Sequence, residues 1–368
     1  MASCIKDEAP NAEADITGIS FEEDVLANSY IDLNPSYDES QNAYPIRISV
    51  KEGTDMTSLA PIFELTPGAT ISPASGSVQN FTTPVRYTVT SEDKAWHRVY
   101  AITAREQKAS NIPTTYHFEK VRIMQNVWQE FYEEQDSGNE LTWASGNKGF
   151  KWAMSEAATE DYPTTQIDNG KTGKCVKLET RLTGDLGNMV GMPIAAGNLF
   201  IGSFDMLNAI TNPLSATRFG TPFYNKPLRL TGYYKYKAGE QFYENGEYTS
   251  RKDIFNIYAI FYDGVKYDSA GKGTDVTLDG NLPNQNYEHS SMVALALVSN
   301  PQETEGDEWK FFDIPFDYQR YGKKIDEARL AKGEYKIGII FASSKDGATF
   351  EGAPGSTLLI DEVELIYE

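Results

Sequence analysis

The stretch LRLTGYYKYK, residues 228–237, places apolar or aromatic residues at even positions and mostly polar residues at odd ones. Because successive side chains leave a strand on opposite faces, this alternation predicts a β-strand with one buried and one solvated face. IYAIFY, residues 257–262, is apolar throughout, which is typical of a strand covered on both faces. Further β-branched and aromatic runs, bounded by Gly, Pro, Asp or Ser, occupy residues 46–50, 85–90, 99–104, 175–180, 291–298, 309–316, 335–343 and 355–368.

This succession of short strands and glycine-rich turns, with no regular alternation of strands and helices, predicts an all-β protein. Two segments differ from the rest. Met124, Val127, Trp128 and Phe131 fall near helical spacing, so we expect a helix over residues 125–134. A short helical turn is expected within residues 323–332.

The chain has 368 residues, which is too long for one average domain. Residues 16–106 have the size of an immunoglobulin-like sandwich, although their single Trp96 and lack of paired cysteines differ from an antibody domain. Residues 107–115 are predicted to form a linker, and residues 116–368 a larger jelly-roll sandwich. Residues 1–15 are expected to be a tether.

The charge of the chain excludes some partners. There are 33 Lys and Arg against 53 Asp and Glu, which gives a net charge of −20. Such a surface repels the phosphates of nucleic acids and disfavours docking on anionic lipid, so neither is an expected partner. Neutral saccharides are not repelled, and the chain has 22 Tyr, 18 Phe and 5 Trp whose rings are able to stack on them. We expect a monomer.

The N-terminal residues predict how the protein is located. A small residue precedes Cys4, and Lys-Asp-Glu follows two positions later, within a polar stretch. This pattern resembles the processed end of bacterial lipoproteins exposed at the cell surface. It predicts lipidation of Cys4 and attachment to the outer membrane through that lipid alone. The alternative is that Cys4 is an ordinary cysteine in a flexible tail.

Three segments of the second half carry a family resemblance. They are IAAGNLFIGSF (194–204), FGTPFYNKPLRLTGYYKYKAGE (219–240) and FASSKDGATFEGAPGSTLLIDEVELIYE (341–368). Together they resemble the "putative carbohydrate metabolism domain" of bacterial surface lipoproteins, over about residue 116 to the C-terminus. The resemblance implies a jelly roll similar to carbohydrate-binding modules and to some glycanases, preceded by an immunoglobulin-like domain. It also implies a role in carbohydrate use.

A glycosidase requires two carboxyl groups that flank the scissile bond. The Glu-x-Asp-x-x-Glu pattern of jelly-roll glucanases is absent, and the nearest candidates are Asp361, Glu362 and Glu364. Strict alternation would place Glu362 and Glu364 together, on a face that we expect to be solvated. It would place Asp361 in an apolar row with Val363 and Leu365. We therefore expect Asp361 to be structural, accepting hydrogen bonds from the loops SSKDG (343–347) and GAPGS (352–356), with catalysis as the second possibility.

Other chemistries have fewer residues to support them. His97, His117 and His289 are the only histidines, so no histidine-rich zinc site or Ser/His/Asp triad is predicted. Cys175 has no evident base beside it and is interpreted as an unreactive thiol. Asp275 and Asp279 are weak candidates for a Ca²⁺ ligand pair, because their spacing does not match a calcium loop. No other cofactor is expected.

Saccharide binding has better candidates. Trp143, Asn147 and Trp152 lie in the Gly- and Asn-containing stretch LTWASGNKGFKWAMSE, residues 141–156, which predicts an exposed aromatic platform with polar neighbours. The alternative is that both tryptophans cover the core from outside. Tyr234 and Tyr236 should project together and are further candidates, although one face of their strand should be core. Trp309 and Phe311 share a face that we expect to be core.

Taken together, these features predict a surface lipoprotein whose C-terminal jelly roll binds a polysaccharide or oligosaccharide. Two alternatives remain open at this stage. The first is a glycoside hydrolase with a carboxylate pair in the jelly-roll cleft, and the second is a structural or adhesive surface protein.

Overall fold

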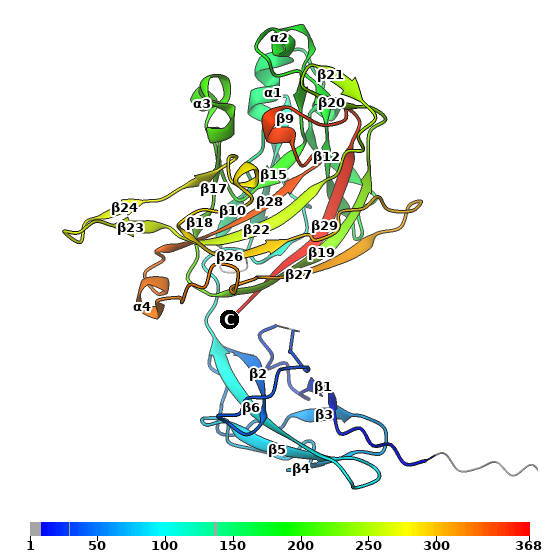
Figure 1. Ribbon diagram of the computed structural model, residues 1–368, viewed down its shortest axis with the longest axis vertical. Helices are drawn as coiled ribbons and strands as arrows, with labels where there is room; N and C mark the ends of the chain where they lie inside the picture. Colours follow the sequence, from blue (N-terminus) through cyan, green and yellow to red (C-terminus); the bar gives the residue numbers. More distant parts are fainter. Residues whose placement is uncertain (1–8, 29, 136–137) are drawn as a thin grey trace, which may run out of the picture. The chain divides into compact units, whose positions relative to one another are not determined.

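The computed structural model describes residues 9–28, 30–135 and 138–368 (Figure 1). The chain divides into two compact units, residues 1–109 and residues 110–367. Strands dominate both units, so the predicted all-β class is confirmed. In the described part of the chain, no helix has the length and apolar character needed to cross a membrane.

The N-terminal unit is a sandwich of two sheets. One sheet pairs β1 with β3, and the other has the order β2-β6-β5-β4, in which β2 and β6 are parallel. Ile16 and Phe63 from the first sheet share a core with Ile48, Tyr87 and Ile102 from the second. The strands are β1 (Ile16–Ser20), β2 (Tyr44–Lys51), β3 (Ile62–Leu65), β4 (Thr70–Ser72), β5 (Val85–Thr90) and β6 (His97–Gln107).

The larger unit contains a sheet of six strands in the order β11-β12-β29-β19-β27, with β7 paired to β29. All of its neighbouring strands are antiparallel. The stretch 228–237 lies in this sheet as β19, between β29 and β27, with Leu230, Tyr234 and Tyr236 on the core side as the alternation predicts. The strands are β7 (Thr115–Tyr116), β11 (Thr164–Asp168), β12 (Lys174–Glu179), β19 (Pro227–Lys237), β27 (Lys310–Pro315) and β29 (Thr357–Tyr367).

The second large sheet has the order β15-β28-β22-β26, with β18 paired to β28. Its strands are β15 (Asn198–Phe200), β18 (Thr221–Pro222), β22 (Asn256–Asp263), β26 (Met292–Leu297) and β28 (Tyr335–Ala342). Ile257 and Phe341 face the first sheet and share its core. Tyr258 and Ile340 face the other way and belong to a second apolar cluster that covers the outer face. The prediction that residues 257–262 are covered on both sides is therefore confirmed.

Shorter elements surround this sandwich. At one end of the larger unit, drawn at the top of Figure 1, lie three helices: α1 (Asn147–Ala153), α2 (Gly184–Met189) and α3 (Met206–Thr211). Two small sheets have the orders β10-β9-β8 and β16-β17-β25, and three hairpins pair β13 with β14, β20 with β21 and β23 with β24. Their strands are β8 (Val121–Met124), β9 (Trp128–Glu134), β10 (Glu140–Thr142), β13 (Arg181–Leu182), β14 (Ile194–Ala195), β16 (Gly202–Phe204), β17 (Thr217–Phe219), β20 (Phe242–Glu244), β21 (Glu247–Thr249), β23 (Val265–Tyr267), β24 (Gly273–Asp275) and β25 (Leu278–Asp279). The single-turn helices are η1 (Thr159–Asp161), η2 (Pro213–Ser215), η3 (Pro283–Gln285) and η4 (Gly347–Thr349).

The predicted helix over residues 125–134 is wrong. Gln125 and Asn126 both have positive φ, 49° and 62°, and they form the turn of a hairpin between β8 and β9. Two successive left-handed residues match the twist of a two-residue hairpin turn and cannot continue an α-helix. The helical turn expected within residues 323–332 is present as α4 (Glu327–Leu330).

The expected core position of Trp309 and Phe311 is also wrong. On β27 the core side is taken by Phe312 and Ile314. Trp309 is half-buried and outside the core cluster, and Phe311 is 53% exposed. Phe312 lies opposite Gly232 of β19, so the strand register directs the alternate aromatic residues outward. Both faces of this strand carry aromatic residues. The composition of the strand therefore could not predict which face is buried.

Candidate functional site

One pocket of the larger unit opens on the outer face of the five-stranded sheet. Its floor is built from two rows that cross β15, β28 and β22. In one row Asn198 and Asn256 lie on either side of Ala342, and in the other Ile340 lies opposite Tyr258. Because these residues have the same parity on their strands, they all project away from the core between the two sheets. The pocket has a volume of ≈ 170 Å³.

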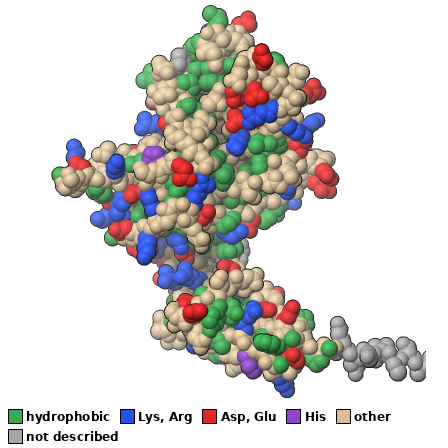
Figure 2. All heavy atoms as spheres, viewed as in Figure 1, with side chains coloured by type: hydrophobic (Ala, Val, Ile, Leu, Met, Phe, Trp, Pro, Cys, Tyr) green, Lys and Arg blue, Asp and Glu red, His purple; other side chains and the backbone are tan. Residues whose placement is uncertain are grey.

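The walls come from the helices at this end of the unit. Gly149, Phe150 and Trp152 of α1 line one side, and Phe204 and Met206 line another. A Cβ atom at Gly149 would lie 3.3 Å from the Phe204 ring, so this glycine allows α1 to approach closely. Trp152 is 38% exposed, so this wall residue is only partly covered by the protein. Figure 2 shows hydrophobic side chains exposed over this end of the larger unit.

Most polar side chains of the pocket are already bonded within the protein. Asn198 accepts a hydrogen bond from the Gly146 amide at 2.8 Å, and Asn256 donates to the Tyr287 hydroxyl at 2.9 Å. Ser344 donates to Asp253 at 2.6 Å. One charged residue, Lys345, lines the pocket, and its described lining contains no Asp, Glu or His. The pocket therefore offers apolar contact and few free polar groups.

A second hollow adjoins this pocket and has a different character. Lys148, Ser203, Asp205, Arg218 and Thr277 line it. It shares two residues with the pocket, Phe204 and Met206, which form the border between them. Asp205 caps α3, because its side chain accepts hydrogen bonds from the amides of residues 207 and 208. The two hollows together place an apolar surface beside a polar and charged one.

Of the two predicted platform tryptophans, the structure places only Trp152 at the pocket. Trp143 is 1% exposed and packs edge-on against Tyr116 in the core, with ring centroids 5.0 Å apart. Its predicted role as an exposed sugar platform is therefore wrong in this structure. Trp143 lies within the core, whereas the alternative had both tryptophans covering the core from outside. Tyr116 and Phe341, from distant parts of the chain, enclose the Trp143 ring. The local sequence around Trp143 could not predict these contacts.

Asn147 and the two tyrosines are also interior residues. The Asn147 side chain accepts a hydrogen bond from the Thr164 amide at 3.1 Å and donates to its carbonyl at 2.7 Å, which ties α1 to β11. Tyr234 and Tyr236 do project together, as predicted, but toward the core, where both rings pack on Phe255 with centroids 4.8 and 4.9 Å away. Because Asn147, Tyr234 and Tyr236 are buried, they cannot contact a ligand directly in this structure. Our prediction that they bind the saccharide is therefore wrong.

The predicted row of Asp361, Val363 and Leu365 is wrong because β29 contains a bulge. Glu362 has φ of 48°, and the pairing of β29 with β19 shifts register beside it. Ile360 and Val363, three positions apart, therefore both face the core. Asp361 lies opposite Tyr233 on the outer face of the sheet.

Asp361 is fully buried on that outer face. Its carboxylate accepts hydrogen bonds from the amides of Thr172 at 3.0 Å and Glu362 at 2.9 Å. Desolvation raises the pKa of Asp361 to about 6, although the amide donors oppose this shift. A structural role fits these bonds, but the loop it holds is 170–173 and not the two loops that we predicted.

Asp253, and not Asp361, accepts the hydrogen bonds that we predicted from the loops 343–347 and 352–356. Its Oδ2 accepts hydrogen bonds from Ser344 Oγ at 2.6 Å, from the Ala353 amide at 2.7 Å and from Ser356 Oγ at 2.7 Å. These donors belong to the loops 343–347 and 352–356. Burial raises the pKa of Asp253 while its hydrogen bonds lower it. No local pattern distinguishes Asp253 in the sequence, because its partners lie 91 to 103 residues away.

Glu362 and Glu364 do not lie in the pocket. Glu362 Oε2 lies 2.9 Å from His117 Nδ1. Burial raises the pKa of Glu364, which lies opposite Thr231 of β19. The bulge at Glu362 interrupts the alternation that predicted a common face for the two carboxylates.

The remaining candidates have other partners or lie outside the structure. Asp275 pairs with Lys336 at 2.7 Å, and Asp279 accepts a hydrogen bond from Ser215 at 2.9 Å. Within the described ranges, no group of three or more His, Cys, Asp or Glu is placed to hold a metal ion. Cys175 is buried, and desolvation raises the pKa of its thiol to about 12. Cys4 lies outside the described residues.

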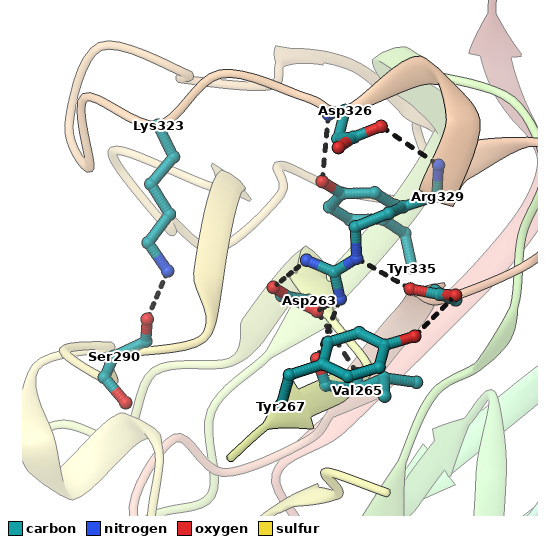
Figure 3. Close-up of polar contacts among 9 residues, drawn as sticks. Asp263, Val265, Tyr267, Ser290, Lys323, Asp326, Arg329 and Tyr335 are labelled. Atoms are coloured by element: carbon teal, nitrogen blue, oxygen red, sulfur yellow. Dashed lines mark hydrogen bonds and ion pairs between the residues drawn. The ribbon is translucent and has the colours of Figure 1, made fainter. Parts of the chain in front are cut away.

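A polar cluster around Arg329 resembles a site but is saturated by its own contacts (Figure 3). The guanidinium binds both oxygens of Asp263, at 2.8 and 2.6 Å, and Glu334 at 2.6 Å. It also lies over the rings of Tyr267 and Tyr335, 5.2 and 5.6 Å from their centroids. Arg329 lowers the pKa of Glu334. We interpret the cluster as a clamp that joins α4 to β22, β23 and β28.

Comparison with known proteins agrees with this fold. Residues 117–366 match the family described as "Putative carbohydrate metabolism domain", and residues 32–104 match "SGBP, N-terminal". A solved structure from Bacteroides thetaiotaomicron, described as a "putative glycoside hydrolase", is 45% identical, covers 99% of both chains and superposes with a TM-score of 0.63. A second structure with the same description, from Bacteroides vulgatus, is 50% identical over 71% of this chain and 100% of its own, with a TM-score of 0.65.

Among curated proteins, no sequence match was found. The family match covers more than half of the chain and includes the segments 194–204 and 219–240 and all but the last two residues of 341–368. The chain belongs to the "Putative carbohydrate metabolism domain" family.

Proposed function

We propose that this protein binds a polysaccharide or oligosaccharide at the pocket beside Trp152, and that it acts in glycan capture or utilisation. The observation that carries the proposal is a partly exposed tryptophan at a pocket on the outer face of a jelly-roll sheet. The C–H face of a sugar ring stacks on an aromatic ring, and the adjoining polar hollow offers partners for its hydroxyl groups. Membership of a carbohydrate-related family supports the same class of ligand.

Binding is preferred to hydrolysis because of the charges at the site. Retaining and inverting glycosidases need two carboxyl groups about 5–10 Å apart across the scissile bond. The described lining of the pocket has no acidic residue, and the adjoining hollow has one, Asp205. Asp361 has a raised pKa, but it is buried beneath residues 170–173. Hydrolysis remains the second candidate because two solved relatives are each described as a "putative glycoside hydrolase".

The test is a glycan array probed with the full chain, followed by titration of the strongest saccharide. Trp152→Ala should weaken binding by about fivefold or more, because stacking residues at binding sites contribute about 1 kcal/mol or more. Trp96→Ala is the matched control, since Trp96 is exposed on the N-terminal unit. Equal binding by wild type and Trp152→Ala would contradict the proposed site.

A parallel assay for released reducing ends distinguishes the second candidate. Wild-type protein should release none from the saccharide that it binds. If reducing ends appear and Asp205→Asn abolishes their release without weakening binding, the protein is a hydrolase and the ranking is reversed.

We also propose that the protein is a monomer anchored at the outer membrane by a lipid on Cys4. In cells that express the precursor, Cys4→Ser should move the protein from the membrane fraction to the soluble fraction. The physical reason is that a lipid chain supplies the anchoring. Unchanged membrane association would contradict the proposed anchor, and sedimentation of the purified protein would test the monomer.

A further inference from the structure

The pocket beside Trp152 is more apolar than a hydroxyl-rich ligand requires. Four phenylalanines line it, together with Met192 and Met206. The polar side chains that line it include Asn198, Asn256 and Ser344, whose hydrogen bonds to other parts of the protein are described above. A sugar ring enclosed entirely within the pocket, rather than stacked on the exposed part of Trp152, would leave hydroxyl groups with few partners, which is unfavourable. An alkyl or aryl group would meet no such penalty.

The adjoining hollow has the opposite chemistry, and the strand pairing explains why. In the ribbon of β16 and β17, Ser203 lies opposite Arg218, and Phe204 lies opposite Thr217. Alternate cross-strand pairs project from opposite faces of such a ribbon. Ser203 and Arg218 accordingly line the polar hollow, whereas Thr217 lines the pocket and Phe204 lies at the border of both.

Two cations of the polar hollow are available to a ligand. Lys148 and Arg218 are both exposed. Within the described part of the chain, neither side chain has a hydrogen bond or an ion pair to the protein. Their donors are suited to hydroxyl and ring oxygens of a saccharide, which accept hydrogen bonds. Asp205 is the acceptor in the same hollow, although its oxygens already bind amides of α3.

A further feature beside the pocket fits an apolar group. On α2, Leu186 and Met189 are exposed, with Met189 at 83%, and Gly187 of the same helix lines the pocket. Exposed apolar side chains that gather near a pocket commonly mark a binding surface.

We propose that the site takes an amphiphilic saccharide, whose apolar substituent enters the pocket while its sugar lies in the polar hollow. The substituent belongs to the class of acyl esters and of alkyl or aryl aglycones. This inference rests on the proposed saccharide binding and specifies its ligand class. Phe204 and Met206, at the border, contact the bond that joins the two parts.

The experiment titrates the full chain with n-octyl β-D-glucopyranoside below its micelle concentration, and with methyl β-D-glucopyranoside and n-octanol as comparison ligands. The corresponding galactosides and mannosides are run in the same way, because the sugar is not specified by the argument. At least one octyl glycoside should bind at least about tenfold more tightly than both its methyl glycoside and octanol.

Two variants separate the parts of the site. Ala209→Leu adds bulk at the pocket. It should weaken binding of the octyl glycoside at least about fivefold and leave binding of the methyl glycoside unchanged. Ala270→Leu, in an exposed loop, is its control. Arg218→Gln should weaken the binding of both glycosides but not the binding of octanol. Lys266→Gln, at another exposed cation, is the control. Thermal melts verify that each variant is folded.

The outcomes distinguish this inference from the proposed function. If a saccharide from the array requires Trp152 but no octyl glycoside binds more tightly than its methyl counterpart, the inference is wrong and saccharide binding stands. If octanol binds as tightly as the octyl glycosides, the pocket is apolar but the bipartite site is overturned. If no array saccharide and no glycoside binds, both proposals fail.

Discussion

Asp253 Oδ2 accepts a hydrogen bond from Ser356 Oγ at 2.7 Å, although 103 residues separate the two in the chain. The same oxygen accepts hydrogen bonds from Ser344 and from the Ala353 amide. One buried carboxylate thus holds the two loops that precede the closing strand. Ser344 also lines the pocket, so these bonds connect the stability of the unit with the shape of the site.

We expect Asp253→Ala to destabilise the larger unit strongly. The substitution leaves the hydroxyls of Ser344 and Ser356 and the Ala353 amide without this acceptor, and each buried unsatisfied group costs about 1–3 kcal/mol. Thermal melting of the variant should show a clear decrease in Tm. Asp313→Ala, at an exposed carboxylate on β27, is the control and should have a small effect. A Tm unchanged by Asp253→Ala would show that the loops do not depend on this carboxylate.

Asp361 should make stability depend on pH. Its folded-state pKa is raised to about 6 from the ordinary aspartate value of 3.8, so the folded protein binds this proton more tightly than the unfolded chain. The contribution of Asp361 to stability is therefore greatest below pH 4 and decreases as the pH rises to about 6. In Asp361→Asn this component should be absent. Chemical unfolding of both proteins from pH 4 to 7.5 measures the difference, and parallel curves would contradict the assignment.

The two tryptophans of residues 141–156 should respond in opposite ways to truncation. Trp143→Ala removes a core side chain and should decrease the free energy of unfolding by about 3–5 kcal/mol. Trp152→Ala removes a partly exposed ring and should change it by about 1 kcal/mol or less. Urea unfolding measures both. A larger loss for Trp152 than for Trp143 would contradict the placement of the two rings.

Arg329→Lys should weaken the clamp in Figure 3 although it keeps the charge. A lysine cannot bind both oxygens of Asp263 and Glu334 together, because its single ammonium lacks the planar fork of a guanidinium. We expect a loss of about 1–2 kcal/mol in the free energy of unfolding. Arg122→Lys is the control, since Arg122 pairs with Glu140 at the surface. Equal effects of the two substitutions would show that the clamp has no special role.

The two units should fold separately. We expect a fragment of residues 110–368 to unfold in one cooperative transition, because its sheets share a core that its own residues complete. Circular dichroism during heating measures this. A fragment that is molten or insoluble would show that the larger unit needs residues 1–109.

The sequence by itself determined the strands and the fold class. Period-two alternation in β19 and the apolar run of β22 result from local chemistry, since a strand must bury one face or both. Strands β2, β5 and β6 of the N-terminal sandwich and the closing strand could be located in the same way, whereas β1, β3 and β4 were not predicted. The helix predicted over residues 125–134 failed because two residues in left-handed geometry make a hairpin turn, which apolar spacing does not reveal.

Only the tertiary structure decided which side chains face a ligand. Trp143 and Trp152 lie in the same local sequence, yet residues such as Tyr116 and Phe341 enclose one and leave the other at a pocket. The bulge at Glu362 reverses the face of Asp361, and Asp253 takes the partners assigned to it. Burial and hydrogen bonding at these positions depend on residues far apart in the chain, and local alternation carries no information about such contacts.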